Sequence, residues 1–405
     1  MSVQWGIELL KSIGLFFLHP MFWFFIIISL ACGYLRIKRE RHTFHTKIAD
    51  MYDELIFTYI KGLIPGILLS ILFFGLGISI PFGLLGIIAA VTALASLTFR
   101  MNWLSSAYIV SAGMFIAFLL QYTHTVPFAD RFPQAFGVNW ASAAVFMGLL
   151  IITEGAAACR SAHLKTSPAL VVSSRGLPIG RQLANRAWLL PLFLLVPGSG
   201  LESHLSWWPV FTVPGGSFHL IWIPYIAGFG QRVQGSLPEV SIRITAKRVM
   251  ILGVIVTAFG AAALWWTPLA GAAACIAVLG RLFLSLRQRL NDNAAPFYFS
   301  KRDQGLMVLG IIPNTPADDL ELKIGEIITK VNGIPVKHVS DFYEALQKNR
   351  AFVKMEIIGL NGEIRFDQRA SYEGEHHELG ILFVQDEHEH EEMQHYNVIF
   401  HNYSE

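Results

Sequence analysis

Long apolar runs separated by short polar loops occupy the first three quarters of the chain. No Asp, Glu, Lys or Arg occurs in the 38 residues from Gly62 to Phe99. Because a transmembrane helix needs about 20 consecutive apolar residues, this stretch predicts two membrane spans rather than a buried helix of a soluble protein. The pattern predicts spans at about 13–35, 57–80, 82–99, 103–122 and 139–159.

The region from 187 to 286 is less regular. Runs 187–201 and 205–230 contain several prolines, and we interpret them as two further spans. Run 249–286 contains one charged residue, Arg281, and a break near Pro268. It is too long for one span, so we interpret it as a tight helical hairpin. These runs together predict a membrane domain over residues 1–290 with about seven to nine helices.

Lysine and arginine are concentrated in alternate loops, at 36–56, 160–186 and 231–248. Basic loops stay in the cytoplasm, so the pattern places these three loops inside the cell and the N-terminus outside. The hairpin over 249–286 then returns the chain to the cytoplasm, whereas a single crossing there would place everything after it outside. The first run, 13–35, is too long for the apolar part of a cleavable signal peptide, so we expect it to remain as a span.

The composition changes after a linker at 291–300. Residues 1–300 carry a net charge of +11, whereas residues 301–405 carry −9. The acidic part argues against nucleic acid as a partner. Short alternating strands, turn signals and one helix at 341–349 with Ser340 as N-cap predict a small α+β domain over 301–371.

A tail at 372–405, rich in His and acidic residues, follows this domain. Within it only Leu379–Val384 has the apolar pattern of an added strand. The predicted fold class is therefore an α-helical polytopic membrane domain followed by a small α+β domain.

The α+β domain resembles bacterial PDZ domains. The resemblance rests on Thr315-Pro316-Ala317, Leu322–Ile328 and Val331-Asn332-Gly333, which follow the family's order and spacing. The sequence departs from the family at Glu321, where Gly is usual, and at Glu326, where Asp is usual.

A PDZ domain binds an extended peptide or C-terminal segment by adding it to an open sheet edge, and the resemblance implies the same here. The family's Gly-Φ-Gly-Φ loop, which holds the terminal carboxylate, aligns with 303–307, although Met307 replaces the second Gly. The alternative is that the apolar members of this set are simply core. The predicted groove residues are Gly305, Leu306, Met307, Val308, Phe342 and Leu346.

Enzyme chemistry finds little support in the sequence. No HExxH zinc motif occurs, and Pro197-Gly198-Ser199-Gly200 lacks the first Gly of an intramembrane serine protease motif. Glu154 and Lys61 lie within about two turns of predicted cytoplasmic span ends, where long side chains reach the interface at low cost. We expect no catalytic residue, no cofactor and no transport function.

A metal site is not expected either. The three cysteines lie in apolar runs without a CxxC motif, and we interpret them as packing residues. The tail histidines could bind metal, but a solvated tail is the favoured interpretation. The cysteines are Cys32, Cys159 and Cys275, and the tail histidines are His376, His377, His388, His390, His395 and His401.

Several spans, a short linker and one terminal PDZ-like domain form an unusual order, and over the whole chain this resembles the MinJ family of division-site factors in Gram-positive rods. The resemblance implies an adaptor that links a DivIVA-like scaffold to a MinD-like ATPase. It also implies a multi-pass protein of the cell membrane, enriched at septum and poles, with the PDZ domain in the cytoplasm. The alternatives are a membrane-tethered PDZ regulator or secretion accessory with a different client, and an enzyme of unrecognised type.

Overall fold

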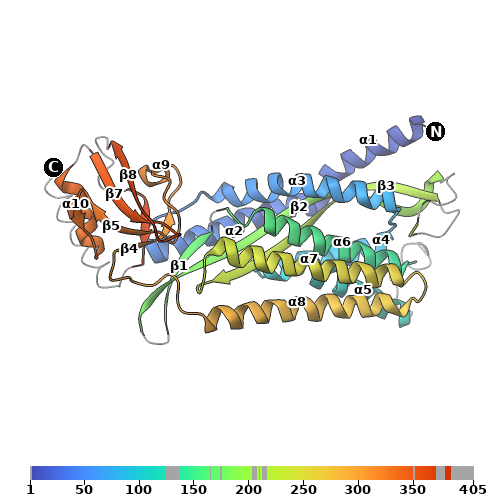
Figure 1. The fold of residues 1–405 in the computed structure, drawn as a ribbon. Coiled ribbons are helices and arrows are strands. Elements are labelled where there is room, and N and C mark those ends of the chain that lie inside the picture. The colour runs from blue at the N-terminus through green and yellow to red at the C-terminus, as the bar shows by residue number, and fades with distance from the viewer. Residues whose placement is uncertain are drawn as a thin grey trace.

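The computed structural model describes residues 2–123, 137–164, 166–173, 176–202, 208, 210–211, 217–349, 352–370 and 379–384. The molecule is elongated: a bundle of helices runs along its length, and a small α+β domain lies at one end (Figure 1). The first helix begins at the opposite end of the bundle, far from the α+β domain.

The helices of the bundle follow the predicted apolar runs closely. Their bounds are α1 Ser2–Leu18, α2 Pro20–Phe44, α3 Met51–Leu76, α4 Phe82–Ser96, the 3-10 helix η1 Met101–Leu104, α5 Ser106–Tyr122, α6 Trp140–Arg160, α7 Pro238–Ala262 and α8 Pro268–Ala294. Five of them, α2, α3, α6, α7 and α8, are long and apolar enough to cross a membrane, and α4 and α5 are shorter apolar helices. The protein is therefore a membrane protein.

Two predictions about the helices change in detail. Run 13–35 is divided between α1 and α2, because His19 is extended and its side chain accepts a hydrogen bond from the Met21 amide, capping α2. Run 249–286 forms α7 and α8, joined by a short turn, which confirms the helical hairpin. Since α8 continues to Ala294, the predicted linker begins inside a helix.

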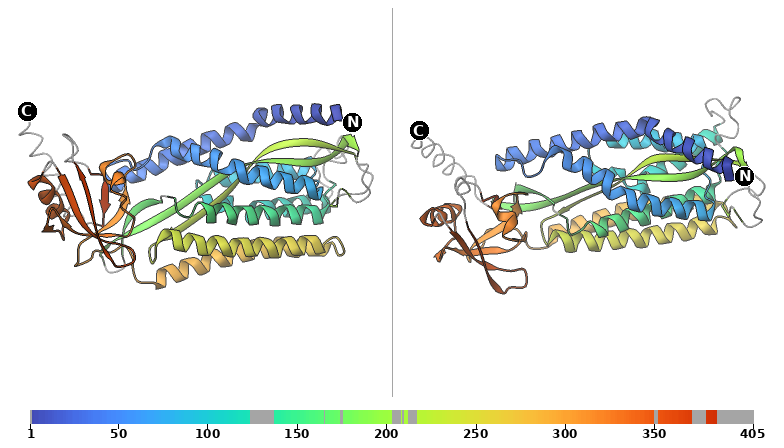
Figure 2. Two further views of the ribbon diagram at one scale, coloured as in Figure 1. Left: turned by 45° about the horizontal axis from the view of Figure 1, so that its top comes forward. Right: turned by 90° about the horizontal axis from the view of Figure 1, so that it is seen from above.

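Two predicted helical spans are wrong. Run 187–201 lies in β2, Pro178–Glu202, and residues 217–230 of the second run lie in β3, Ser217–Val233. The two strands form a long antiparallel ribbon, with β1, Ser167–Val172, on the other side of β2. The ribbon runs lengthwise through the helical bundle (Figure 2). The prolines explain the difference, because Pro191 and Pro224 face each other across the ribbon and neither has an N–H to donate to a helix.

Helix α3 packs so closely on β2 that only small residues fit between them. A side chain at Gly62 would meet the backbone of Leu189, and one at Gly66 would meet Pro191. One turn further on, the Ser70 hydroxyl accepts a hydrogen bond from the Phe193 amide at 2.9 Å and lies 2.9 Å from the Pro191 carbonyl. Ser70 of α3 thus forms hydrogen bonds with backbone groups at the edge of β2, where the bilayer offers no water to do so.

Glycine 62 gives a test of this packing. We expect Gly62→Ala to destabilise the protein by about 1–3 kcal/mol, because the added methyl group meets backbone that cannot move easily. Gly75→Ala is the matched control in the same helix, since a side chain there meets no atom within 4 Å. Thermal unfolding in detergent micelles measures both. Equal melting temperatures for the two variants would contradict the close packing of α3 on β2.

A buried ion pair connects helices α6 and α8 of the bundle. Arg281 of α8 and Glu154 of α6 lie 3.3 Å apart, and both side chains are almost completely buried. Glu154 also accepts hydrogen bonds from the Ser105 hydroxyl and the Ser106 amide. Glu154 therefore does not reach the interface as predicted, whereas Lys61 is exposed.

The C-terminal domain is a sheet covered by a short helix. Its strands stand in the order β8-β7-β5-β4-β9, with β6 paired to β5. The elements are β4 Leu306–Ile311, α9 Pro316–Asp319, β5 Ile327–Val331, β6 Ile334–Pro335, α10 Val339–Lys348, β7 Phe352–Ile358, β8 Ile364–Ala370 and β9 Ile381–Phe383. The strand expected at Leu379–Val384 is confirmed as β9.

Local turn and cap chemistry explains several boundaries of this domain. Gly362, in the turn between β7 and β8, has a φ of +82°, a conformation that glycine adopts without strain. Helix α10 begins after His338 rather than after Ser340, because Asp341 accepts the His338 amide in a capping box.

The two domains meet in an apolar cluster that we call the seam. Two hydrogen bonds to its members reinforce it, from the Gln182 side chain to the Leu309 carbonyl at 2.6 Å and from the Gly180 amide to the Phe299 carbonyl at 2.8 Å. All three basic loops lie at this end of the bundle, since α2 and β1 contribute to the cluster and the loop before α7 touches Gly325. The buried members of the seam are Phe44, Ile48, Phe299, Met307, Leu309, Leu382 and Val384.

Candidate functional site

The predicted groove strand, β4, lies inside the sheet rather than at its edge. Leu306 and Met307 pair with β5, and the part from Val308 to Ile311 pairs with β9. All six predicted groove residues are buried. A partner strand therefore has no free edge on β4 while β9 is in place.

The side chains of β4 and β9 alternate between two surroundings. On one face, Leu306 and Val308 of β4 and Ile381 and Phe383 of β9 join the core that includes α10. On the other face, Met307, Leu309, Leu382 and Val384 join the seam. The two strands thus connect the core of the small domain directly to the membrane domain.

Strand β9 is the end of the sheet, and it lies beside α10. The rings of Phe383 and Phe342 pack edge to face with centroids 5.0 Å apart. Leu346, one turn further along α10, belongs to the same core. No strand among the described residues pairs with the second edge of β9. In this arrangement an added strand would pair with β9, next to the predicted helix residues Phe342 and Leu346.

The turn before β9 matches the carboxylate-loop pattern better than the turn before β4. Leu379-Gly380-Ile381 reads Φ-Gly-Φ, and Gly380 has a φ of +81°, which disfavours a side chain. The turn is held by hydrogen bonds from the Ile312 and Ala317 amides to the carbonyls of Gly380 and Leu379. The prediction from sequence missed this match, because it placed the carboxylate loop before the first strand of the domain, whereas the pattern lies at the C-terminal end.

The two departures from the family pattern have structural roles. Glu321 has a φ of +48°, the left-handed conformation that explains the usual Gly at this place. Glu326 accepts the Lys323 amide and forms an ion pair with Arg365 at 2.8 Å. Hydrogen bonding to Glu326 raises the pKa of the Arg365 guanidinium, and the longer side chain of Glu lets the turn reach β8.

Comparisons with known proteins support the assignment of this domain as a PDZ domain and show the family of the whole chain. A family model described as a PDZ domain matches residues 307–358. Cell division topological determinant MinJ from Bacillus subtilis (strain 168) is 79% identical over 391 residues, which is 96% of this chain and 98% of that protein. The chain belongs to the MinJ family.

More distant members share a part of the chain. Probable cell division topological determinants MinJ from Lacticaseibacillus paracasei and from Lacticaseibacillus casei (strain BD-II) are each 31% identical over 85 residues, about 21% of this chain. As a member of the MinJ family the chain is a cell division topological determinant with a PDZ domain and several membrane helices.

The expectation of a solvated tail without a metal site stays a prediction. The described residues contain no group of three or more His, Cys, Asp or Glu able to hold a metal ion. The tail histidines, from His376 to His401, lie outside the described residues.

Phe383 tests whether β9 belongs to the folded PDZ domain. We expect Phe383→Ala to cost about 3–5 kcal/mol, because it removes a buried ring that packs on α10. Phe366→Ala on β8 is the matched control, since that ring is 65% exposed and should cost less than about 1 kcal/mol. Hydrogen–deuterium exchange of peptides from β4 and α10 reports the difference. Unchanged exchange in Phe383→Ala would show that β9 is dispensable.

Proposed function

We propose that this protein is a membrane adaptor of division-site selection, which links a DivIVA-like scaffold to a MinD-like ATPase and confines the division inhibitor to poles and septa. The observation that carries the proposal is the near full-length similarity to MinJ, together with the edge strand of the PDZ domain. This strand, β9, pairs with β4 on one side, and no described strand pairs with its other side.

The PDZ edge suits capture of an extended segment. Strand addition gives affinity through main-chain hydrogen bonds, and the groove beside α10 gives specificity through side chains. Anchoring to the bundle confines the domain to the membrane surface, so a modest affinity is raised by effective concentration. An extended peptide or C-terminal segment of a partner at β9 is therefore the proposed ligand class.

The PDZ domain is proposed to lie in the cytoplasm. Support comes from the basic loops, which all lie at the seam end of the bundle, and from the hairpin of α7 and α8, two helices that are each long and apolar enough to cross a membrane. Alkaline phosphatase fused after Ala295 should therefore be inactive, because it needs export to become active. The same reporter fused after Thr123, in the connection between α5 and α6 that the basic-loop pattern places outside, serves as the control and should be active. High activity after Ala295 would contradict the proposed topology.

Truncation in cells tests the adaptor role. A fluorescent fusion should gather at septa and poles in a DivIVA-dependent way, and deletion should give filamentous cells because the inhibitor is no longer confined. A chain ending after Val384 keeps β9 and should still recruit MinD, whereas one ending after Ala370 should insert in the membrane but fail to recruit it. Uniform membrane fluorescence with normal cell length in the deletion strain would favour a PDZ regulator or secretion accessory with a different client.

A further inference from the structure

A cavity of about 760 Å³ lies at the seam, between the end of the helical bundle and the PDZ domain. The membrane domain contributes the last turns of α2, the start of α3 and parts of β1, β2 and α7, and the PDZ domain contributes residues of β4 and of the turn around Lys323. The cavity is lined by both domains, so a ligand bound there would touch each of them.

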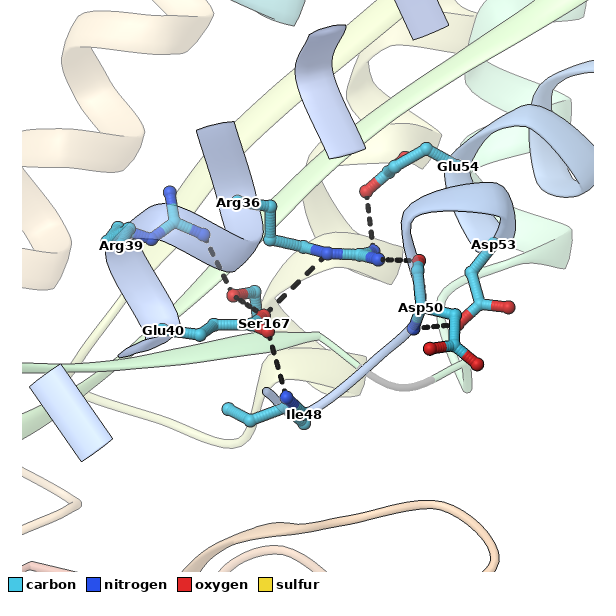
Figure 3. A network of polar contacts seen from close by, with 8 residues as sticks. All are labelled: Arg36, Arg39, Glu40, Ile48, Asp50, Asp53, Glu54 and Ser167. Atoms are coloured by element: carbon cyan, nitrogen blue, oxygen red, sulfur yellow. Dashed lines mark hydrogen bonds and ion pairs between the residues drawn. The ribbon is translucent and has the colours of Figure 1, made fainter. Parts of the chain in front are cut away.

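A polar network holds one wall of this cavity (Figure 3). Glu40 is at its centre, 1% exposed, and accepts hydrogen bonds from the Ile48 amide and from the Ser167 hydroxyl, both at 3.0 Å. Arg36 binds Glu54 at 2.8 Å and the Asp50 carbonyl at 2.6 Å. The network ties α2, the α2–α3 loop and β1 together.

Three arginines on this cavity have a buried donor without a hydrogen bond among the described residues, and Arg36 is one of them, although its Nε lies 3.7 Å from Glu40. In the described part of the chain, the other two, Arg186 and Arg39, have no such carboxylate beside the donor. Arg186 is only 4% exposed and donates one N–H to the Leu164 carbonyl, but its buried Nη1 has no hydrogen-bond partner among the described residues. Arg39 donates Nη2 to Ser167 at 2.8 Å, and its buried Nε likewise has no described partner. Buried guanidinium donors without acceptors are costly, so these donors call for an oxygen acceptor beyond the described residues.

The acidic side chains that line the cavity already have partners other than the free donors of Arg39 and Arg186. Both oxygens of Glu40 are bonded, and Glu54 pairs with Arg36. Asp53 accepts the Asp50 amide, and Glu239 pairs with Arg243 at 2.7 Å. The donors of Arg39 and Arg186 are therefore left for an anionic oxygen.

Apolar side chains on the cavity wall point to an amphiphilic ligand. Leu35, Phe99 and Val240 line it and are 42%, 40% and 51% exposed. In a membrane protein, exposed apolar side chains at a helix end lie against acyl chains. We propose that this cavity binds the phosphoryl group of an anionic phospholipid, held by Arg39 and Arg186, with its acyl chains leaving past these side chains.

The probes separate the phosphoryl group from the chains. Purified full-length protein in a neutral detergent is titrated with dioctanoyl phosphatidylglycerol, dioctanoylglycerol and glycerol 3-phosphate, and binding is followed by native mass spectrometry. The anionic lipid should bind as one molecule per chain at least about tenfold more tightly than either of the other probes. Dioctanoylglycerol lacks the phosphoryl group and so the charged hydrogen bonds, which contribute about that factor. Glycerol 3-phosphate lacks the acyl chains and so the burial of apolar surface, which contributes at least as much.

Three variants locate the site. Arg186→Gln and Arg39→Gln should each weaken phosphatidylglycerol binding about tenfold. Arg41→Gln is the matched control, because Arg41 lies on the same helix as Arg39 but is exposed and does not line the cavity. Arg39 is only half-buried, so Arg39→Gln should fold and can test the site even if Arg186→Gln does not fold. Melting temperatures measured without lipid identify any unfolded variant.

Each remaining outcome overturns the proposal. Equal binding of glycerol 3-phosphate would show that the ligand is a soluble phosphate compound. Equal binding of dioctanoylglycerol would show that acyl chains alone are recognised. The same affinity loss in Arg41→Gln and in folded Arg39→Gln would show diffuse attraction to surface charge rather than a site.

Discussion

The membrane domain depends on pairing the backbone of a two-stranded ribbon inside an apolar bundle. Each unpaired N–H or C=O group in such surroundings costs several kcal/mol, so a ribbon with open edges cannot stand against lipid. Helix α3 solves this on one edge, because Gly62 and Gly66 let it approach β2 and Ser70 binds the Phe193 amide. The prolines at 191 and 224 remove two further donors from the middle of the ribbon.

A buried ion pair lies beside the same ribbon. The guanidinium of Arg281 lies over the ring of Phe229 in β3, 5.5 Å from its centre, while binding Glu154 of α6. A buried pair of this kind adds little net stability over apolar residues, but removal of one partner costs about 3–5 kcal/mol. The pair therefore serves mainly to fix which faces of α6, α8 and β3 meet.

Much of this fold could be predicted from the sequence, but not the ribbon or the groove edge. Charge-free length revealed the helices and the α7–α8 hairpin, because membrane thickness fixes how many apolar residues a span needs. Length and hydropathy do not separate a buried strand from a helix, so the helical spans predicted for runs 187–201 and 205–230 are wrong, and most described residues of these runs lie in β2 and β3. The groove prediction followed motif order along the chain, whereas β9 reaches the sheet edge only through tertiary pairing with β4.

Strand β9 gives the PDZ domain a mechanical connection to the membrane. Successive side chains of a strand point to opposite faces, so Phe383 packs toward α10 while Leu382 and Val384 pack on the seam. A partner strand added to β9 would extend the same hydrogen-bonded sheet, and any shift of β9 toward it would move both faces together. If a partner adds to β9 as proposed, its binding and the docking of the domain on the bundle would act on the same strand, so each would be expected to affect the other.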